Sequence, residues 1–320
     1  MVSPTQFSQV TRQGTVEYPR SWYPFCLSKE VRKNKVINVR AFGREWVCFR
    51  NSQNNVYVMQ RYCPHMGVDL TRGKVDQHLT CPLHNKKFPE VACQRERDGL
   101  PIQLKCTEEA GMVFVFLGNH EEEPLPGKIR DGAMSFLSTY DYPAPFQMVG
   151  LNGFDIHHLG IVHKRQVSTE PEVEILDELG IRINYQAAVA GTHLRDRLLR
   201  LWKIDSVDIN INCYAGSILQ FDHKKINAQT LLCLLPVEKN RTRIFLRTIL
   251  LEKKKSPITF LMASAVQLSI IKFLKQDFEP LWDSRFMPEG MYQPEDNFAI
   301  QWIEHYDAIP KVSVTIEEKS

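Results

Sequence analysis

The 320-residue chain has 43% hydrophobic and 24% charged residues, a composition typical of globular proteins that excludes disorder, collagen and coiled coil. Its 40 Lys and Arg residues against 37 Asp and Glu residues give a net charge of +3, which is too weak to indicate a nucleic-acid partner. Eight cysteines are too few for a disulfide framework, and residues 1–13 lack the pattern of a secretory signal, so we expect a reducing, cytoplasmic environment.

The first half of the chain is predicted to be rich in β-strands. Residues Val36–Phe49 partly alternate between apolar and polar types, Asn51–Asn55 has the composition of a turn, and Val56–Met59 resumes an extended pattern. This succession predicts a β-hairpin. The uninterrupted apolar run Met112–Leu117 is closed by Gly118 and predicts a buried strand.

A domain boundary is predicted after this strand. The segment His120–Lys128 is acidic and carries two prolines, which is typical of a linker. A chain of this length is also long enough for two domains that each bury a core. We therefore divide the sequence into an N-terminal tail at 1–20, a first domain at 21–122 and a second domain at 123–320.

The second half is predicted to contain longer strands and two helices. Val207–Cys213 alternates strictly, which predicts a strand with one buried and one solvated face. Leu231–Val237 and Thr242–Leu251 flank a polar turn and predict an antiparallel hairpin. Helical periodicity is present in Asp155–His163 and in Ile258–Trp282.

The longest apolar stretch, Pro257–Ile271, overlaps the second predicted helix. Four polar side chains interrupt it, and it is shorter than the roughly 20 residues that span a bilayer. We therefore expect a buried helix and no transmembrane span. Lys253–Lys255, just before the stretch, is interpreted as a solvated charge run rather than a lipid contact.

Two Cys/His pairs form the first candidate site. Cys63 and His65 are followed, after fifteen residues, by Cys81 and His84, so two loops each offer one thiolate and one imidazole. Such a set suits either a closed tetrahedral Zn²⁺ site or a [2Fe–2S] cluster whose irons take two Cys and two His respectively. Zinc fingers usually pair Cys with Cys and His with His, whereas each loop here is mixed, which favours the cluster.

A second candidate site lies on the first predicted helix. Asp155, His158 and His163 form the pattern D-x2-H-x4-H, with His157 as a rival to His158. Two imidazoles and one carboxylate are the facial triad of mononuclear non-haem Fe(II) enzymes, which leaves open positions for O2. The histidines are five residues apart and not the four of a regular helix face, so we expect the helix to end or distort near Gly160.

The first motif, C-x-H-x15-C-x2-H with Pro after each cysteine, resembles the cluster motif of Rieske proteins. Respiratory members staple the two loops with a further cysteine pair, but the matching positions here hold Val68 and Leu83, which points to the oxygenase and ferredoxin branches. Oxygenases usually read C-P-Y-H-G-W in the second loop, where this chain has Leu83, Asn85 and Lys86. We expect Lys86 and Lys87 to steer an acidic electron donor to the cluster.

The order of the motifs resembles the catalytic α subunit of Rieske non-haem iron oxygenases, and steroid- and secondary-metabolite-oxidising members in particular. This resemblance assigns His158 and His163 to the iron. It also assigns Asp155 to an electron-transfer bridge from His84 in the cluster of one subunit to His158 of its neighbour, within a homotrimer.

The resemblance places the third iron ligand far downstream. The segment from Gln276 to Trp282 looks like the Q-D-x-x-x-W segment of the steroid-hydroxylating branch, so Asp277 is the expected carboxylate ligand. Glu279 and Asp283 are its rivals.

The resemblance further implies an α+β fold, with an all-β Rieske [2Fe–2S] domain at 21–122 and a helix-grip (START-like) antiparallel sheet with helices in the catalytic domain at 123–320. It implies O2 as co-substrate and Fe(II) as the second metal. Because the sequence lacks a G-x-G-x-x-G fingerprint, electrons would come from NAD(P)H only indirectly, through a separate ferredoxin or flavin reductase.

The expected reaction is oxidation of a small, bulky and apolar organic substrate. Monooxygenation is favoured over dioxygenation, desaturation and oxidative ring closure. Two alternatives stay open, namely a Rieske electron carrier fused to a hydrophobic-ligand-binding module without oxygenase chemistry, and a structural zinc protein.

Overall fold

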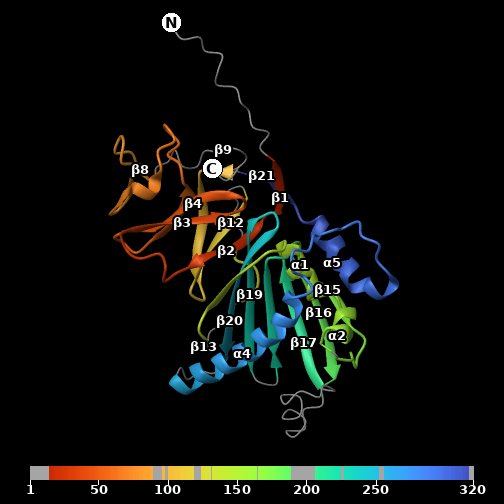
Figure 1. Ribbon diagram of the computed structural model, residues 1–320. Coiled ribbons are helices and arrows are strands. Elements are labelled where there is room, and N and C mark those ends of the chain that lie inside the picture. The colour runs from red at the N-terminus through yellow and green to blue at the C-terminus, as the bar shows by residue number, and fades with distance from the viewer. Residues whose placement is uncertain are drawn as a thin grey trace.

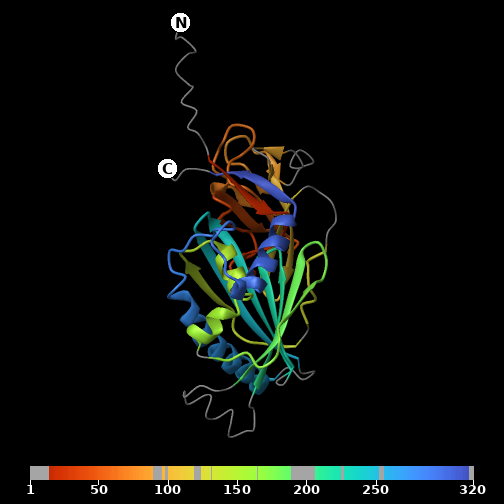
Figure 2. The ribbon, with the colours of Figure 1, turned by 90° about the vertical axis from the view of Figure 1, so that its right-hand side faces the viewer.

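The computed structural model describes residues 14–88, 96–97, 100–118, 124–130, 132–163, 165–188, 206–224, 227–251 and 256–316. Within these ranges the chain forms two β-rich parts, and the strands of the first part lie at one end of the large sheet of the second (Figure 1 and Figure 2). The expected α+β class is confirmed, with an all-β N-terminal part followed by an antiparallel sheet that carries helices.

The first part is built on a six-stranded antiparallel sheet in the order β2-β12-β11-β5-β4-β3. These strands are β2 (Ser21–Leu27), β3 (Lys35–Ala41), β4 (Arg44–Arg50), β5 (Val56–Gln60), β11 (Gln103–Glu109) and β12 (Met112–Leu117). Smaller elements between them are η2 (Leu70–Arg72), the sheet of β6 (Lys74–Val75), β7 (Leu79–Thr80) and β8 (Lys87–Phe88), and the pair β9 (Glu96–Arg97) and β10 (Leu100–Pro101). Every residue of β12 is buried, as its apolar sequence predicts.

The hairpin predicted around residues 51–55 is confirmed, because β4 and β5 pair antiparallel on either side of that turn. The segment 36–49, in which the sequence analysis placed no turn, folds back on itself as the second hairpin β3–β4. Its turn residues Phe42 and Gly43 have positive φ angles of 56° and 69°. Their N–H groups donate to the carbonyls of Pro236 and Val237 in the second part, so an inter-domain contact helps to fix this turn.

The second part is an eight-stranded antiparallel sheet in the order β13-β20-β19-β18-β17-β16-β15, with β14 paired to β20. The strands are β13 (Ala133–Met134), β14 (Ser138–Tyr142), β15 (Glu172–Ile175), β16 (Gly180–Ala188), β17 (Ser206–Tyr214), β18 (Ile218–His223), β19 (Ala228–Glu238) and β20 (Arg241–Leu250). The described helices of this part are α1 (Phe146–Asn152), α2 (His157–Ile161), α4 (Pro257–Phe278) and α5 (Asn297–Ala308), which follows η5 (Pro294–Asp296) (Figure 1). Of these, α4 packs on β20 and β13, α1 on β19 and α5 on β15.

The strand predictions for this sheet are confirmed, and one detail is wrong. The predicted strand 207–213 is β17, and the predicted hairpin is β19–β20. The polar face of β17 was expected to be solvated along its length, but Asn212 is buried. Its side-chain oxygen accepts a hydrogen bond at 2.7 Å from the Nε of Arg182 on β16, which satisfies the buried amide.

The two ends of the described chain meet in a separate two-stranded sheet. Strand β1 (Thr15–Pro19), inside the segment predicted to be a tail, pairs antiparallel with β21 (Lys311–Thr315) near the C-terminus. The boundary predicted between residues 122 and 123 stays a prediction, because 119–123 lie outside the described residues.

Helix α4 differs from the buried helix that the sequence predicts. The helix itself is confirmed, and Ser256 caps its N-terminus through a hydrogen bond from the Thr259 N–H. However, only 28% of its most apolar 18-residue window is buried. By length and composition alone, with a mean hydropathy of 1.6, it is the one helix in the described part of the chain that could cross a membrane.

Candidate metal centres

The two Cys/His loops share one backbone conformation. The Gly67 N–H donates to the Cys63 carbonyl at 2.8 Å, and the Asn85 N–H donates to the Cys81 carbonyl at 3.1 Å. Gly67 and Asn85 both have positive φ angles, of 70° and 54°. Asparagine tolerates this left-handed conformation better than most residues, so Asn85 keeps the loop shape at the position where oxygenases usually have glycine.

The four side chains of these loops divide into a buried pair and an exposed pair. Cys63 and Cys81 are buried, with 1% and 0% exposure. His65 and His84 are exposed, and their Nδ1 atoms face each other at 3.2 Å. Two imidazole nitrogens this close leave room for one metal ion between them after a small adjustment.

Hydrogen bonds from the backbone reach the buried thiols. Burial raises the pKa of the Cys63 thiol. Burial acts in the same direction on Cys81, but the backbone N–H groups of Leu83 and His84, the Cys63 thiol and the Lys86 charge together outweigh it, and the pKa of the Cys81 thiol is lowered. The second loop therefore stabilises a thiolate, the form in which cysteine binds a metal.

The geometry tests the zinc alternative. Four ligands around a single tetrahedral Zn²⁺ lie roughly 3.3–3.8 Å from one another. Among the described residues, one group of three His, Cys, Asp or Glu side chains has all its ligand atoms within 4.8 Å of one another, and this group lies in the second part of the chain. No three ligands of the two Cys/His loops, all of which are described, lie that close together. The loop ligands are thus too widely spread for one ion, and they fit a two-iron cluster with one metal at each pair.

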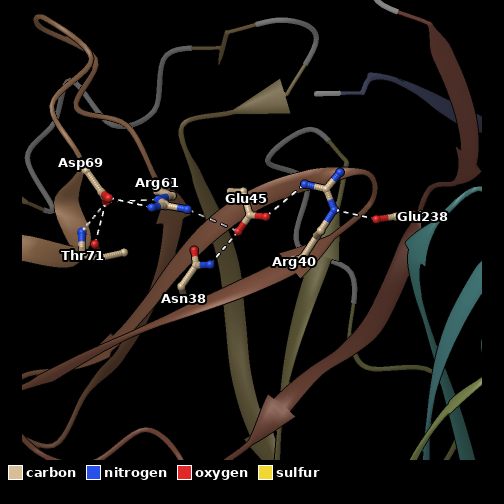
Figure 3. Close-up of polar contacts among 7 residues, drawn as sticks. All are labelled: Asn38, Arg40, Glu45, Arg61, Asp69, Thr71 and Glu238. Carbon is tan, nitrogen blue, oxygen red and sulfur yellow. Dashed lines mark hydrogen bonds and ion pairs between the residues drawn. The ribbon is translucent and has the colours of Figure 1, made fainter. Parts of the chain in front are cut away.

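A series of ion pairs connects the first Cys/His loop to the second domain (Figure 3). Asp69 beside this loop contacts Arg61 at 2.7 Å, and Arg61 lies 3.8 Å from Glu45. Arg40 contacts Glu45 at 3.0 Å and Glu238 of β19 at 2.9 Å. We call these five residues the ionic chain. Because its members are partly exposed, it contributes little to stability and mainly fixes the position of the first loop relative to β19.

The second candidate site brings together three residues from two distant segments. His158 lies on α2, His163 follows the end of that helix, and Asp277 lies in the last turn of α4. The Asp277 Oδ1 atom is 3.5 Å from the His158 Nε2 atom and 2.6 Å from the His163 Nε2 atom. All three ligand atoms lie within 4.8 Å of one another.

The end of α2 positions the two histidines. The helix expected over 155–163 spans only His157–Ile161, and it ends next to Gly160, as the spacing predicts. The Val162 N–H donates to the His158 carbonyl at 2.7 Å, which closes the last turn. His163 therefore leaves the helix direction and turns toward His158, with 5.3 Å between the ring centroids.

Each imidazole is oriented through its Nδ1 atom. In His158 this atom contacts the backbone carbonyl of Asp155, whose carboxylate also accepts the His158 N–H at 3.1 Å. In His163 it lies 3.0 Å from the side-chain oxygen of Gln276, and the ring stacks on Phe273 at 3.7 Å. Such contacts leave both Nε2 atoms directed at Asp277, the arrangement by which proteins orient metal-binding histidines.

The site fits a cation because two of its ligand atoms have lone pairs that are not engaged in hydrogen bonds. His163 Nε2 and Asp277 Oδ1 are buried and lie 2.6 Å apart, but their geometry is not that of a hydrogen bond, and neither has another hydrogen-bond partner. A buried acceptor without a partner is costly, and a bound metal ion would satisfy both of these atoms at once. Two imidazoles and one carboxylate provide the ligand types of a non-haem Fe(II) site.

The rival ligands do not take part in this group. His157, Glu279 and Asp283 are exposed, and none of them belongs to it. The structure thus distinguishes His158 from His157, which the sequence did not. Asp155 lies next to the group with its carboxylate 37% exposed, and no contact in the structure tests its predicted bridging role.

Sequence reasoning missed three residues around the triad. Gln276 adjoins Asp277, so the Gln-Asp pair itself could have indicated its role. Tyr142 and Tyr185 come from β14 and β16, and burial together with the nearby Asp277 charge raises the pKa of both phenols. Their strands are not marked by any local motif, and only the packed sheet brings them to the site.

A comparison with protein families matches residues 21–105 to the Rieske [2Fe-2S] domain, a range that contains both Cys/His loops. Among solved structures, the chain is similar to dicamba monooxygenase bound to dicamba, with a TM-score of 0.60 and 15% identity over 91% of this chain and 97% of that one. Pseudomonas putida CBB5 NdmA with caffeine gives a TM-score of 0.62 and 16% identity over 94% and 97% of the two chains. The chain therefore contains a Rieske [2Fe–2S] domain, and its fold is that of the dicamba monooxygenase and NdmA structures.

Curated relatives are sterol- and steroid-oxidising proteins. Cholesterol 7-desaturase nvd of Hemicentrotus pulcherrimus is 28% identical over 167 residues, which are 46% of this chain and 36% of that protein. The oxygenase component of 3-ketosteroid-9-alpha-monooxygenase from Rhodococcus rhodochrous is 32% identical over 118 residues, or 34% and 31% of the two chains. The chain is homologous to both, and its matches cover 36% to 41% of the length of the first three desaturases.

Proposed function

We propose that this chain is a terminal oxygenase component that oxidises a bulky, apolar, sterol-like substrate with O2. The observation that carries the proposal is the convergence of His158, His163 and Asp277 in a chain that also contains a Rieske domain. Two of their ligand atoms, His163 Nε2 and Asp277 Oδ1, are buried without a hydrogen bond. A ligand-binding module without iron chemistry would have no reason to leave these atoms without hydrogen bonds.

We assign Cys63, His65, Cys81 and His84 to the [2Fe–2S] cluster, and the triad to Fe(II). When bound, the cluster would supply single electrons, and Fe(II) would supply the site for O2 chemistry. The protein itself orients the metal ligands and keeps the site dry. Gln276 and the Asp155 carbonyl fix the imidazole tautomers, and burial of Asp277 keeps water from competing for the site.

The proposed assembly is a homotrimer in which Asp155 links two subunits. Its carboxylate is partly exposed beside His158, so a cluster histidine of a neighbouring copy, equivalent to His84, can reach it. The exposed position of His65 and His84 on the first domain suits such an approach. A heterologous contact of this kind closes into a ring.

Electrons are proposed to come from a ferredoxin or flavin reductase, and thus from NAD(P)H indirectly. Lys86 and Lys87 are exposed at the end of the second Cys/His loop. Desolvation and, after it, the positive charge of Lys86 lower the pKa of His65. Positive charge this close to the cluster favours an acidic donor.

The seven cysteines in the described part of the chain form no disulfide, which suits the reducing cytoplasmic environment that we propose.

We propose monooxygenation as the reaction, in line with the expectation from the sequence, and desaturation as a second candidate because the desaturases are among the homologues. The test is aerobic incubation of the iron- and sulfide-reconstituted protein with a reductase, NADH and a sterol mixture, followed by mass spectrometry. A gain of one oxygen atom supports monooxygenation, and a loss of two hydrogen atoms supports desaturation. No oxidised product from any sterol or steroid would reject the proposed substrate class.

A further inference from the structure

Helix α4 presents an apolar face to solvent. Ile258, Leu261, Met262 and Leu268 are 69%, 64%, 48% and 56% exposed. Leu261 and Met262 follow Ile258 by three and four residues, and Leu268 follows Leu261 by seven, which places all four on one side of the helix. Figure 1 shows α4 running diagonally across the eight-stranded sheet, with its N-terminal end at the edge of the molecule. Soluble proteins rarely leave such a continuous apolar stripe uncovered.

The opposite face of α4 is small and polar, and it is the face that packs on the sheet. Its buried residues are Thr259, Ala263, Ser264, Gln267 and Asp277. The side-chain nitrogen of Gln267 donates to the Ser138 hydroxyl and its oxygen accepts the Thr248 N–H, each at 2.9 Å. These polar contacts hold the helix in one rotation, so it cannot turn its apolar stripe inward.

Positive charge predominates around the stripe. Residues 252–279 contain five lysines against Glu252, Asp277 and Glu279, and Asp277 is buried at the candidate iron site. Lys272 and Lys275 are exposed at the C-terminal end of the helix. Lys253–Lys255 precede its N-terminus in the sequence and lie outside the described residues. The stripe is therefore apolar in its centre and followed by positive charge, with further positive charge just before it in the chain.

We propose that α4 docks this protein on the surface of a membrane that contains anionic lipid. An in-plane helix buries an apolar face among acyl chains and places its lysines near the headgroups. From Ile258 to Lys275 the helix offers a contact about 26 Å long. A spanning orientation is incompatible with the structure, because Gln267 and Asp277 are bound to the sheet and to the candidate iron site.

The lipid surface fits this face better than a second copy of the chain does. Two copies that met through their α4 stripes would bring together more lysines than acidic residues. Anionic headgroups supply the missing charge, and each lysine near such a surface strengthens binding. Docking would also hold the C-terminal end of α4, which carries Asp277, beside the lipid in which an apolar substrate dissolves. Of these arguments, this one alone rests on the proposed function.

The test is sedimentation of the reconstituted full-length protein with phosphatidylcholine vesicles, with and without phosphatidylserine. We expect binding to the vesicles with phosphatidylserine that weakens as salt is added. The double variant Leu261→Glu/Leu268→Glu should lower the partition coefficient at least about tenfold, because it places charge in the acyl region. The matched control is Ile175→Glu on β15, where the native side chain is 57% exposed, and it should bind like the wild type.

A second pair of variants tests the charge. Lys272→Gln/Lys275→Gln should lower binding on the order of tenfold and reduce its dependence on phosphatidylserine. Retention of the cluster absorbance reports that each variant is folded. None of these measurements requires turnover, so a protein without oxygenase activity could still bind vesicles, and an active oxygenase could fail to bind them.

Three results would overturn the proposal. The first is absence of binding to vesicles with phosphatidylserine. The second is binding that Leu261→Glu/Leu268→Glu leaves unchanged. The third is a smaller assembly of that variant than of the wild type in lipid-free solution, measured by light scattering, because the stripe would then be a contact between copies.

Discussion

The two candidate metal centres are built in opposite ways. The Cys/His ligands of the first lie within 22 residues of one another, on two loops with the same backbone turn, and the imidazoles are exposed. The second joins α2 to a carboxylate more than 110 residues away, and two of its three ligand atoms are buried without a hydrogen bond. An exposed centre suits electron exchange with partners, whereas a buried one suits chemistry that must exclude water. The contrast predicts that damage at one centre should leave the other intact.

The largest expected effect is at the buried centre. Asp277→Ala removes the only carboxylate of the triad, and we expect iron affinity at this centre to fall at least about 100-fold and product formation to cease. Iron analysis should fall from about three atoms per chain to about two, with the visible spectrum of the cluster unchanged. The exposed rival Asp283→Asn serves as the control. Wild-type iron content in Asp277→Ala would contradict the assignment.

The connection between the centres should be nearly as sensitive. Asp155→Asn keeps the backbone carbonyl that contacts His158, so both metals should bind normally. We expect turnover to fall roughly 100-fold, equivalent to about 2.7 kcal/mol in the barrier, if the carboxylate links one subunit's cluster to its neighbour. Single-turnover oxidation of a pre-reduced cluster measures this step directly. Full activity in the variant would refute the bridge.

A smaller loss is expected when a histidine at the buried centre loses its support. Gln276→Ala removes the acceptor for the His163 Nδ1 atom, and changes of this kind typically lower metal affinity about 10–100-fold. Gln276→Glu keeps an acceptor at the same place and should restore most of the affinity. Competition with a chelator measures the difference. Equal affinities in all three proteins would show that this contact does not orient the ligand.

Substitutions near the exposed centre should change the rate at which the cluster is reduced. Lys86→Glu/Lys87→Glu reverses the charge near the cluster, and we expect cluster reduction by an acidic ferredoxin to slow several-fold at low salt and to lose its salt dependence. Stopped-flow reduction at several ionic strengths is the measurement. The pair Lys33→Glu/Lys35→Glu, exposed elsewhere on the first domain, is the control. If both pairs slow reduction equally, the effect is one of net charge and not of a docking site.

The smallest expected effect concerns the ionic chain. The Arg61 guanidinium and the Thr71 N–H hold the pKa of Asp69 well below its ordinary value. Because the folded pKa is the lower one, Asp69 stabilises the fold above the unfolded value of about 3.9, and this contribution disappears as the pH falls through the folded pKa. Asp69→Asn should lower the free energy of unfolding by about 1 kcal/mol at pH 7.

The same variant gives the pH test. The difference in unfolding free energy between wild type and Asp69→Asn should shrink as the pH is lowered from about 4, with unfolding followed by loss of the cluster absorbance. Asp76→Asn changes an exposed aspartate of the same region and is the control. A difference that stays constant from pH 7 to pH 3 would show that the Asp69 charge is not its source.

Local sequence patterns predicted most of the elements. Strict alternation identified β17, an unbroken apolar run identified β12, and turn chemistry located the hairpins on either side of residues 51–55 and 238–241. The turn at Phe42 was missed because its hydrogen bonds go to carbonyls in the other domain. The same limit applied to α4, since hydropathy predicts that an apolar helix is buried but cannot show which side faces the sheet.

The order of residues along the chain was enough to identify the candidate metal ligands. The spacing of Cys63, His65, Cys81 and His84 already requires two loops that each carry one cysteine and one histidine. The histidine spacing in the second half likewise requires a helix end at Gly160. Packing of the folded chain then selected which groups meet: it chose His158 over His157, brought Asp277 to both histidines, and left the apolar side of α4 in solvent. Ligand type is a property of a single residue, whereas proximity and exposure depend on how distant segments pack.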